Sequence, residues 1–328
     1  MSNTNVKGSF WGFEVRRRQL AGVWPNAAYT APPAEVQFGW FGGGGTPGAI
    51  STVDRIDYNN DAVTASVRGS LVVSKNYLSA TGNNNYGWFG GGRNSSNTII
   101  STVERIDYAA DGSTATTRGS LEATRYILSA TGTSNYGWFA GGGFLPDKSA
   151  VSRIDYANDG NTATTRGPLS SARSYLSASG NSNYGWFAGG GFPSMFSTVN
   201  RIDYTNDSTA AGVRGSLSLS RAGSAASGNS NYGWFGGGFT PSSPVSTVDR
   251  IDYNNDAVAA SVRGPLTDVV QNLAATGSSI YGWFGGGSPG FRSSVFRVDY
   301  SSDSNIASSR GTLSISRNTL AATGGFPG

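Results

Sequence analysis

Cysteine and histidine are both missing from this sequence of 328 residues. Without cysteine the chain can form neither disulfide bonds, nor a thiolate nucleophile, nor a cysteine-ligated metal site. Without histidine it lacks the most common general base and the most common ligand of transition metals. We therefore expect no cofactor and no metal ion, and both absences argue against an enzyme.

Charged residues and long hydrophobic runs are also scarce. Only 13% of the residues are charged, and the net charge of +4 is dispersed along the chain, so no nucleic-acid-binding patch is indicated. No apolar run approaches 18 residues, which predicts that no helix spans a membrane. Residues 1–20 lack the apolar core of a signal peptide, which argues against Sec-dependent export.

Glycine, by contrast, is abundant, with 48 residues. Such a composition suits short strands joined by tight turns, because glycine adopts positive φ without steric cost. An aromatic motif, Tyr-Gly-Trp-Phe or Phe-Gly-Trp-Phe, recurs six times, with its tryptophans at Trp40, Trp88, Trp138, Trp186, Trp234 and Trp283. Their intervals of 48, 50, 48, 48 and 49 residues lie in the range for four-stranded propeller blades. We therefore predict an all-β fold, a six-bladed β-propeller over residues 38–328.

The second copy illustrates the four strands expected in each blade. Its pattern predicts strands over residues 86–89, 101–108, 114–117 and 126–131. Between the second and third of these, we expect Asp111 to cap a turn in which Gly112 has positive φ. The last strand ends in small residues, as expected beside the axis, where space is scarcest. It therefore becomes the inner strand of the following blade.

The two ends of the repeat region predict how the ring closes. The first copy has no recognisable inner strand before Phe38, whereas the last copy ends in an unpartnered one over residues 320–323. Pairing these two ends completes the first blade and leaves no exposed edge at the axis. The first blade would then combine three N-terminal strands with one C-terminal strand.

The repeat resembles the kelch repeat of β-propellers. Gly90-Gly91 and Asp107-Tyr108 look like the glycine pair and the strand end of that motif, although the order of Asp and Tyr is reversed. The outer-strand tryptophan of kelch repeats is missing, and the tryptophan precedes the glycines instead. This resemblance implies a kelch-like propeller architecture. The copper site of kelch-fold oxidases is not implied, because it requires His and Cys.

The string Tyr-Gly-Trp-Phe-Gly-Gly-Gly, followed by a Ser-Thr-Val-Asp-Arg-Ile-Asp-Tyr segment, also resembles repeat proteins of marine bacteriophages. Those proteins are structural components of the virion. The resemblance implies a virion location, in a head or tail appendage, with synthesis in the host cytoplasm.

One face of the predicted propeller carries loops that differ between copies. The loops that follow the glycines vary in length and character, and they are expected to share a face with the loops that enter the inner strands. Candidate binding residues on this face are Arg93, Phe144, Leu145, Lys148, Phe192, Met195, Phe196, Phe239, Phe291 and Arg292. Exposed apolar clusters mark interaction surfaces, but the same side chains can also fill gaps between blades. For the face as a whole we favour binding, because variation between propeller repeats concentrates where partners bind.

A cation precedes five of the six inner strands: Lys75, Arg125, Arg173, Arg221 and Arg317. The fifth copy breaks the series with Val270 at this position. A basic ring near the axis suits an anion such as phosphate, sulfate or an acidic sugar. The alternative, which we favour, is that each cation pairs with a carboxylate or carbonyl group.

Six Asp-Tyr-x-x-Asp segments suggest a carboxylate-rich calcium site, but calcium needs six to eight oxygen ligands. The six pairs are Asp57/Asp61, Asp107/Asp111, Asp155/Asp159, Asp203/Asp207, Asp252/Asp256 and Asp299/Asp303. Because an arginine precedes each pair, we interpret them as turn caps within an ion-pair network. Identical pairs in six blades also argue against glycosidase chemistry, which needs one pocket with unequal carboxyl pKa values.

Residues 1–37 belong to no repeat. They contain aromatic and basic side chains followed by a proline-rich stretch, and the expected anchoring residues are Phe10, Trp11, Phe13, Arg16, Arg17 and Arg18. We interpret the segment as an arm that docks on another virion protein, with packing against the chain's own propeller as the alternative.

Together these patterns predict a non-enzymatic virion protein, part of a homo-oligomeric or larger assembly. It would dock through its N-terminal arm and present a propeller face to a protein or a host-surface glycan. The alternatives are a polysaccharide-active propeller enzyme and an intracellular kelch-type adaptor.

Overall fold

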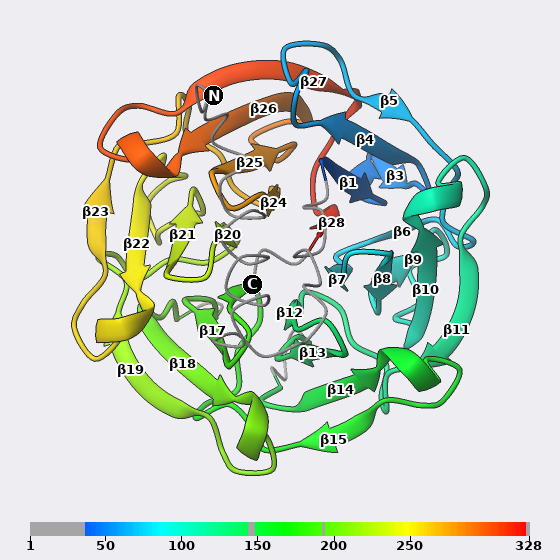
Figure 1. Cartoon of the computed structure of the whole chain (residues 1–328), viewed down its shortest axis with the longest axis horizontal. Coiled ribbons are helices and arrows are strands. Elements are labelled where there is room, and N and C mark those ends of the chain that lie inside the picture. The colour runs from blue at the N-terminus through cyan, green and yellow to red at the C-terminus, as the bar shows by residue number, and fades with distance from the viewer. Residues whose placement is uncertain (1–36, 144–147, 192–193, 326–328) are drawn as a thin grey trace, which may run out of the picture. The chain divides into compact units, whose positions relative to one another are not determined.

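The propeller architecture is seen in the computed structural model, which describes residues 37–143, 148–191 and 194–325. Six four-stranded antiparallel sheets surround a central axis as blades (Figure 1). The predicted six-bladed all-β fold is confirmed. Among the described residues, no helix is long and apolar enough to cross a membrane.

Each blade runs from an inner strand at the axis, through a second and a third strand, to an outer strand at the rim. Blades 1 and 2 consist of β28 (Ala321–Gly324), β1 (Phe38–Gly42), β4 (Val53–Asp57) and β5 (Ser66–Val67), and of β7 (Ser79–Gly82), β8 (Tyr86–Gly90), β10 (Thr102–Asp107) and β11 (Thr116–Ser120). Blades 3 and 4 consist of β12 (Ser129–Gly132), β13 (Tyr136–Ala140), β14 (Val151–Asp155) and β15 (Thr164–Arg166), and of β16 (Ser177–Gly180), β17 (Tyr184–Ala188), β18 (Thr198–Asp203) and β19 (Gly212–Ser216). Blades 5 and 6 consist of β20 (Ala225–Gly228), β21 (Tyr232–Gly236), β22 (Val248–Asp252) and β23 (Ser261–Arg263), and of β24 (Ala274–Gly277), β25 (Tyr281–Gly285), β26 (Arg292–Asp299) and β27 (Ser308–Arg317).

The blades also carry short strands and 3-10 helices outside their four-stranded sheets. Two small ribbons pair β2 (Gly45–Thr46) with β3 (Gly48–Ala49) and β6 (Lys75–Asn76) with β9 (Arg93–Asn94). One-turn 3-10 helices follow the third strands of blades 2 to 6: η1 (Tyr108–Ala110), η2 (Tyr156–Asn158), η3 (Tyr204–Asn206), η4 (Tyr253–Asn255) and η5 (Tyr300–Ser302).

The ring closes as predicted, through the C-terminal strand. β28 pairs antiparallel with β1, so that Trp40 lies opposite Thr323. Two of the four strands predicted for the second copy have clearly different bounds. The outer strand expected over residues 114–117 is β11, Thr116–Ser120. The strand expected over residues 126–131 begins only at Ser129, because Ile127 has a φ of 58°, in the left-handed region that interrupts extended pairing.

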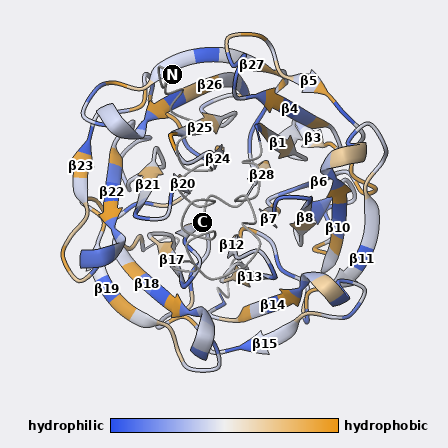
Figure 2. Ribbon diagram, in the orientation of Figure 1, coloured by the Kyte–Doolittle hydropathy of each residue, from blue (hydrophilic) through white to orange (hydrophobic). Residues whose placement is uncertain are grey.

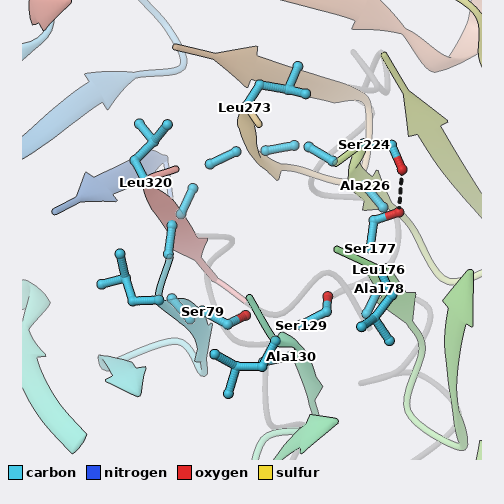
Figure 3. Close-up of a pocket in the computed structure, with 18 residues that line it drawn as sticks. Ser79, Ser129, Ala130, Leu176, Ser177, Ala178, Ser224, Ala226, Leu273 and Leu320 are labelled. Atoms are coloured by element: carbon cyan, nitrogen blue, oxygen red, sulfur yellow. Dashed lines mark hydrogen bonds between the residues drawn. The ribbon is translucent and has the colours of Figure 1, made fainter. Parts of the chain in front are cut away.

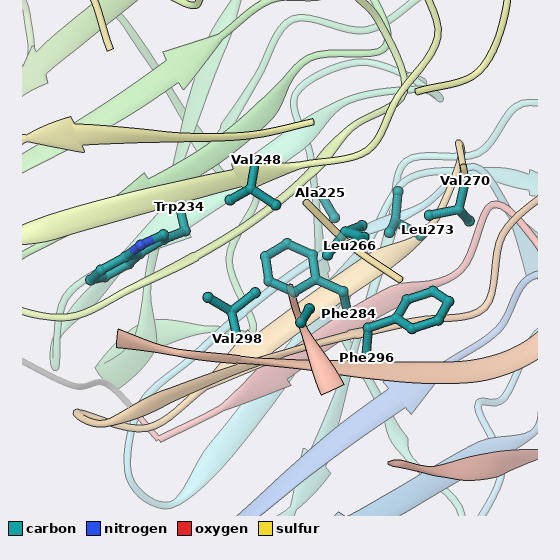
Figure 4. Close-up of a cluster of buried hydrophobic side chains, with 10 residues drawn as sticks. Ala225, Trp234, Val248, Leu266, Val270, Leu273, Phe284, Phe296 and Val298 are labelled. Carbon is teal, nitrogen blue, oxygen red and sulfur yellow. The ribbon is translucent and has the colours of Figure 1, made fainter. Parts of the chain in front are cut away.

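The hydrophobic core lies between neighbouring blades rather than in one central layer. Trp88 and Phe89 are fully buried and point from opposite faces of β8, so blade 2 packs against blade 3 through Trp88 and against blade 1 through Phe89. Figure 4 shows an equivalent cluster between blades 5 and 6, built around Phe284. In Figure 2 hydrophobic residues mark the third strands, whereas the outer strands β11 and β15 are pale or hydrophilic. Each buried aromatic side chain contributes about 1.5–3 kcal/mol through the hydrophobic effect.

A repeated polar tie also joins each blade to the next. In blade 4, Trp186 Nε1 donates to Asp256 Oδ2 of blade 5 at 2.8 Å, and Arg201 and Arg214 form ion pairs with the same oxygen. The acceptors of the six ties, in blade order, are Asp111, Asp159, Asp207, Asp256, Asp303 and Asp61. The last of these accepts from Trp283 of blade 6 and therefore closes the ring.

A stacked tyrosine completes each tie. Tyr253 of blade 5 stacks on Trp186 with ring centroids 3.8 Å apart, and its hydroxyl is hydrogen-bonded to Ser179 of blade 4 at 2.7 Å. The glycine of the aromatic motif is required here. A Cβ on Gly233 would lie 2.6 Å from the Tyr253 hydroxyl. The same arrangement recurs around the ring.

The Asp-Tyr-x-x-Asp segments are therefore structural, as expected, but the two aspartates have different roles. Asp107 accepts a hydrogen bond from the Ala109 backbone N–H and caps η1, whereas Asp111, which was expected to cap the turn, binds blade 1. Gly112 does not have the predicted positive φ, because the turn is a right-handed 3-10 helix. Among the described residues, no group of three or more carboxylates is placed to bind a metal ion.

Candidate functional site

The variable loops and the loops that enter the inner strands share one face, as predicted. β9, which follows the glycines of blade 2, pairs with β6, which precedes the inner strand of the same blade. In blade 1, Gly45 forms a bridge to Asn318 in the same way. We call this the variable-loop face.

A closed ring of six backbone hydrogen bonds surrounds the axis at this face. In each blade the ring residue stands just before the inner strand, and its N–H donates to the carbonyl of the equivalent residue in the neighbouring blade at 2.7–3.1 Å. The six residues are Tyr77, Ile127, Tyr175, Gly223, Asn272 and Thr319. We call the opening that they surround the axial mouth.

All six residues of the axial mouth have left-handed backbone conformations, with φ between 53° and 63°. This conformation costs about 1–3 kcal/mol for a residue other than glycine, and it is least favourable for β-branched Ile127 and Thr319. Only Gly223 adopts it freely. Retained backbone strain of this kind is typical of functional sites, and the hydrogen-bonded ring holds the opening in one shape.

One side of the axial mouth is aromatic. Tyr77 packs edge-to-face against Tyr126 and Tyr175, with centroids 6.0 and 6.2 Å apart, and Tyr175 packs in the same way against Phe239 at 6.0 Å. We call these four residues the aromatic crescent. Tyr126 is buried and the other three are half-buried. Burial, reinforced by neighbouring Tyr77, raises the pKa of Tyr175 above its ordinary value, so its hydroxyl stays protonated at physiological pH.

The other side of the axial mouth is polar and open. Asn272 and Thr319 line it in blades 6 and 1. Gly223 lies between the two sides, where a Cβ would come within 2.7 Å of Asn272 Oδ1 and 3.0 Å of the Phe239 ring. Any larger residue at this position would therefore crowd Asn272 and Phe239.

Beneath the axial mouth, a narrow channel runs between the six inner strands. The opening itself has a volume of about 70 Å³, and it leads to a cavity of about 120 Å³ lined by leucine, serine and alanine side chains. Figure 3 shows these side chains around the axis, including the hydrogen bond between Ser177 and Ser224. Towards the opposite face, hydroxyl-bearing and glycine residues line a second cavity of about 120 Å³.

The predicted binding residues fall at different places on the variable-loop face. Phe239 belongs to the aromatic crescent, and Arg93 lies over Tyr126 with its guanidinium carbon 4.5 Å from the ring centroid. Phe291 is 44% exposed, and Arg292 forms an ion pair with Asp268. Lys148 is exposed, while Met195 and Phe196 are half-buried. Phe144, Leu145 and Phe192 lie outside the described residues, as do the six anchoring residues of the N-terminal arm.

The five cations expected near the axis are buried, and they do not form an exposed ring. Four of them pair with carboxylates: Lys75 with Glu104, Arg125 with Glu122, Arg221 with Asp249, and Arg317 with Asp54. Most of these carboxylates stand on the third strand of the same blade. The anion-binding interpretation is therefore wrong for these residues, and the pairing interpretation is the one observed.

The remaining two blades vary this buried pair. In blade 4, Arg173 has Asn200 instead of a carboxylate, at 2.6 Å, and burial lowers the pKa of Arg173 to about 10. In blade 6 both members are apolar, because Val270 and Phe296 occupy the two positions and join the hydrophobic cluster of Figure 4. An ion pair is thus replaced by hydrophobic packing without loss of the blade.

The aromatic residues of the axial mouth were missed from the sequence, although a signal exists. Immediately before each inner strand, otherwise similar copies read Asn-Tyr, Tyr-Ile, Ser-Tyr, Ala-Gly, Gln-Asn and Asn-Thr. This pair of positions varies as strongly as the loops. Comparing the six copies position by position would have identified Tyr77, Tyr126 and Tyr175.

Comparison with solved structures supports the architecture. No family model matches the sequence, and no curated protein matches it either. Among the solved structures that match is YjhT, with a TM-score of 0.63 and 12% sequence identity over 76% of this chain and 87% of that protein. At this identity the similarity shows the fold alone.

Proposed function

We propose that this propeller is a non-enzymatic binding protein that recognises a host-surface glycan through its variable-loop face. The observation that carries the proposal is the axial mouth, where Tyr77 and Tyr175 meet the amide of Asn272 and the hydroxyl of Thr319 in a pre-formed opening. Binding sites combine apolar walls with a few placed polar groups in this way. Nearly all other repeated positions serve the packing and ties between blades.

The chemistry of the described axis also favours binding over catalysis. Its cavities are lined by leucine, alanine, glycine and hydroxyl side chains, with Asn272 and two tyrosines at the opening. The charged side chains expected near the axis are buried in pairs. The paired carboxyl groups that hydrolysis of a glycan usually needs do not belong to this set of lining residues.

We place this binding function on a phage virion, in a head or tail appendage, because the repeat resembles virion structural proteins. Residues 1–37 would dock the chain on another virion protein, leaving the propeller face outward. Deleting residues 1–37 should leave a folded propeller that no longer joins its assembly. Normal incorporation of the truncated chain would exclude this role of the arm.

A glycan array probed with the full chain tests the binding function. We expect binding to a limited set of glycans, with no change in the mass of the bound glycans after prolonged incubation. Absence of binding to any bacterial surface glycan would contradict glycan recognition, and shortened glycans would contradict a non-enzymatic function.

A further inference from the structure

One arginine on the variable-loop face has no ion-pair partner among the described residues. Every other described arginine forms an ion pair with a carboxylate or, in the case of Arg173, donates hydrogen bonds to carbonyl and amide oxygens. The exception is Arg93, whose guanidinium contacts the ring of Tyr126 but no carboxylate or carbonyl group among the described residues. An arginine held without a carboxylate beside an opening is suited to an anion from outside.

Arg93 lies beside the axial mouth, to which Tyr126 connects it. Its guanidinium carbon lies 4.5 Å from the ring centroid of Tyr126, and Tyr126 contacts Tyr77 of the ring that surrounds the opening. Arg93 is anchored in β9, whose pairing with β6 fixes it beside the residue that precedes Tyr77. A guanidinium that stacks on an aromatic ring still has N–H groups free to donate to a planar anion. Arg93 can therefore bind a carboxylate at one end of the aromatic crescent.

These groups together match the chemistry of an acidic sugar. The C–H face of a pyranose ring is apolar and packs on aromatic side chains, whereas its hydroxyls need donors and acceptors such as the amide of Asn272. We propose that the axial mouth binds the terminal sugar of an acidic glycan, with the sugar ring on the aromatic crescent and its carboxylate on Arg93. This inference rests on the proposed binding function and names its ligand.

The size of the opening determines how much of the sugar enters. A volume of about 70 Å³ is too small to enclose a hexose but large enough for one substituent of the ring. The sugar therefore lies across Tyr77 and Tyr175 with one substituent directed into the axial mouth. We therefore expect the site to recognise the end of a glycan.

Isothermal titration calorimetry of the full chain with two matched sugars tests the inference. The probes are methyl β-D-glucuronide and methyl β-D-glucoside, which differ in the carboxylate. We expect the glucuronide to bind about tenfold or more tightly than the glucoside, because a hydrogen bond to a charged group contributes about 1.5–3 kcal/mol.

Two substitutions separate the parts of the site. Arg93→Gln should remove the tenfold preference and leave the affinity for the glucoside unchanged. Tyr175→Asn should weaken both sugars about threefold to tenfold through loss of the stacking surface. Its backbone should be tolerated, since Asn272 already holds this conformation in blade 6. The matched control is Arg292→Gln on the same face, whose guanidinium already pairs with Asp268 and whose loss should change neither affinity.

The outcomes distinguish this inference from the function on which it rests. If the wild-type chain binds glycans on the array but shows no preference for the glucuronide, or keeps that preference in Arg93→Gln, the acidic-sugar inference is overturned while glycan binding stands. If Arg292→Gln loses the preference and Arg93→Gln keeps it, the site lies elsewhere on the face. Failure of the chain to bind any glycan would overturn both.

Discussion

The same repeat builds the axial mouth and the ties that join neighbouring blades. The ties keep the same side chains in every copy, whereas the axial mouth does not. Each tie uses a tryptophan, two arginines and an aspartate, and all six copies retain this set. The axial mouth keeps its backbone hydrogen bonds in all six copies but carries six different pairs of side chains. The ring thus fixes its architecture with repeated residues and leaves a few positions around one opening to vary. Substitutions in the two regions should therefore have opposite effects on stability and binding.

The largest effect on stability is expected from breaking one tie. Asp256→Ala leaves Trp186, Arg201 and Arg214 without their shared acceptor in a mostly buried site. We expect the free energy of unfolding in urea to fall by about 3 kcal/mol, since a buried charge without its partner is strongly destabilising. A loss below about 1 kcal/mol would show that the ties do not hold the blades together.

The stacked tyrosines of the ties should make the ring sensitive to alkali. Burial raises the pKa of Tyr108, Tyr156, Tyr204, Tyr253 and Tyr300 above the ordinary value of 10.0. Above pH 10 the unfolded chain loses phenol protons that the folded chain keeps, so stability falls as the pH rises. Each tyrosine lowers the free energy of unfolding by about 1.4 kcal/mol per pH unit above its ordinary pKa, and none has this effect below it.

Unfolding curves measured at several pH values between neutrality and strong alkali check this dependence on pH. Tyr253→Phe should make the slope of unfolding free energy against pH shallower by the amount that one tyrosine contributes. The substitution also removes the hydrogen bond to Ser179. An equal slope in both proteins would mean that Tyr253 ionises as readily in the folded ring as in the unfolded chain.

A smaller effect is expected where one blade departs from the others. In blade 4, Asn200→Asp would give Arg173 the carboxylate that Arg221 has in blade 5. We expect stability to rise by about 1 kcal/mol, because a buried cation gains an opposite charge. Thermal unfolding should show a higher Tm, and a lower Tm would mean that desolvation of the new carboxylate exceeds its attraction to Arg173.

The smallest effect on stability belongs to the axial mouth. Tyr77→Asn removes an aromatic side chain but suits the left-handed backbone, so we expect the free energy of unfolding to change by no more than about 1 kcal/mol. A loss comparable to that of Asp256→Ala would show that the aromatic crescent is structural packing rather than a binding surface.

The sequence supports prediction of the propeller because its signals are local and repeated. The tryptophan spacing predicts six blades, and the small residues over 320–323 predict the strand that closes the ring. The capping role predicted for Asp111 was wrong because the partner of Asp111 lies in another blade, 71 residues away at Trp40. Only the folded ring brings those two residues together.

The axial mouth was harder to predict for the same reason. Its residues are about fifty positions apart, and they meet only because six equivalent backbones converge on the axis. The burial of Lys75 and its equivalents depends on a residue of the third strand, such as Glu104, whose side chain could equally have faced solvent. The composition of the axial mouth and the burial of these cations both depend on which distant residues the fold brings together, not on the local sequence pattern.

A crystal structure of the full chain bound to methyl β-D-glucuronide would locate the acidic sugar itself. We expect the sugar ring on Tyr77 and Tyr175 at the axial mouth, with its carboxylate at hydrogen-bond distance, about 3 Å, from the Arg93 guanidinium. A sugar bound on the opposite face or between blades, with the axial mouth empty, would show that the variable-loop face is not the binding site.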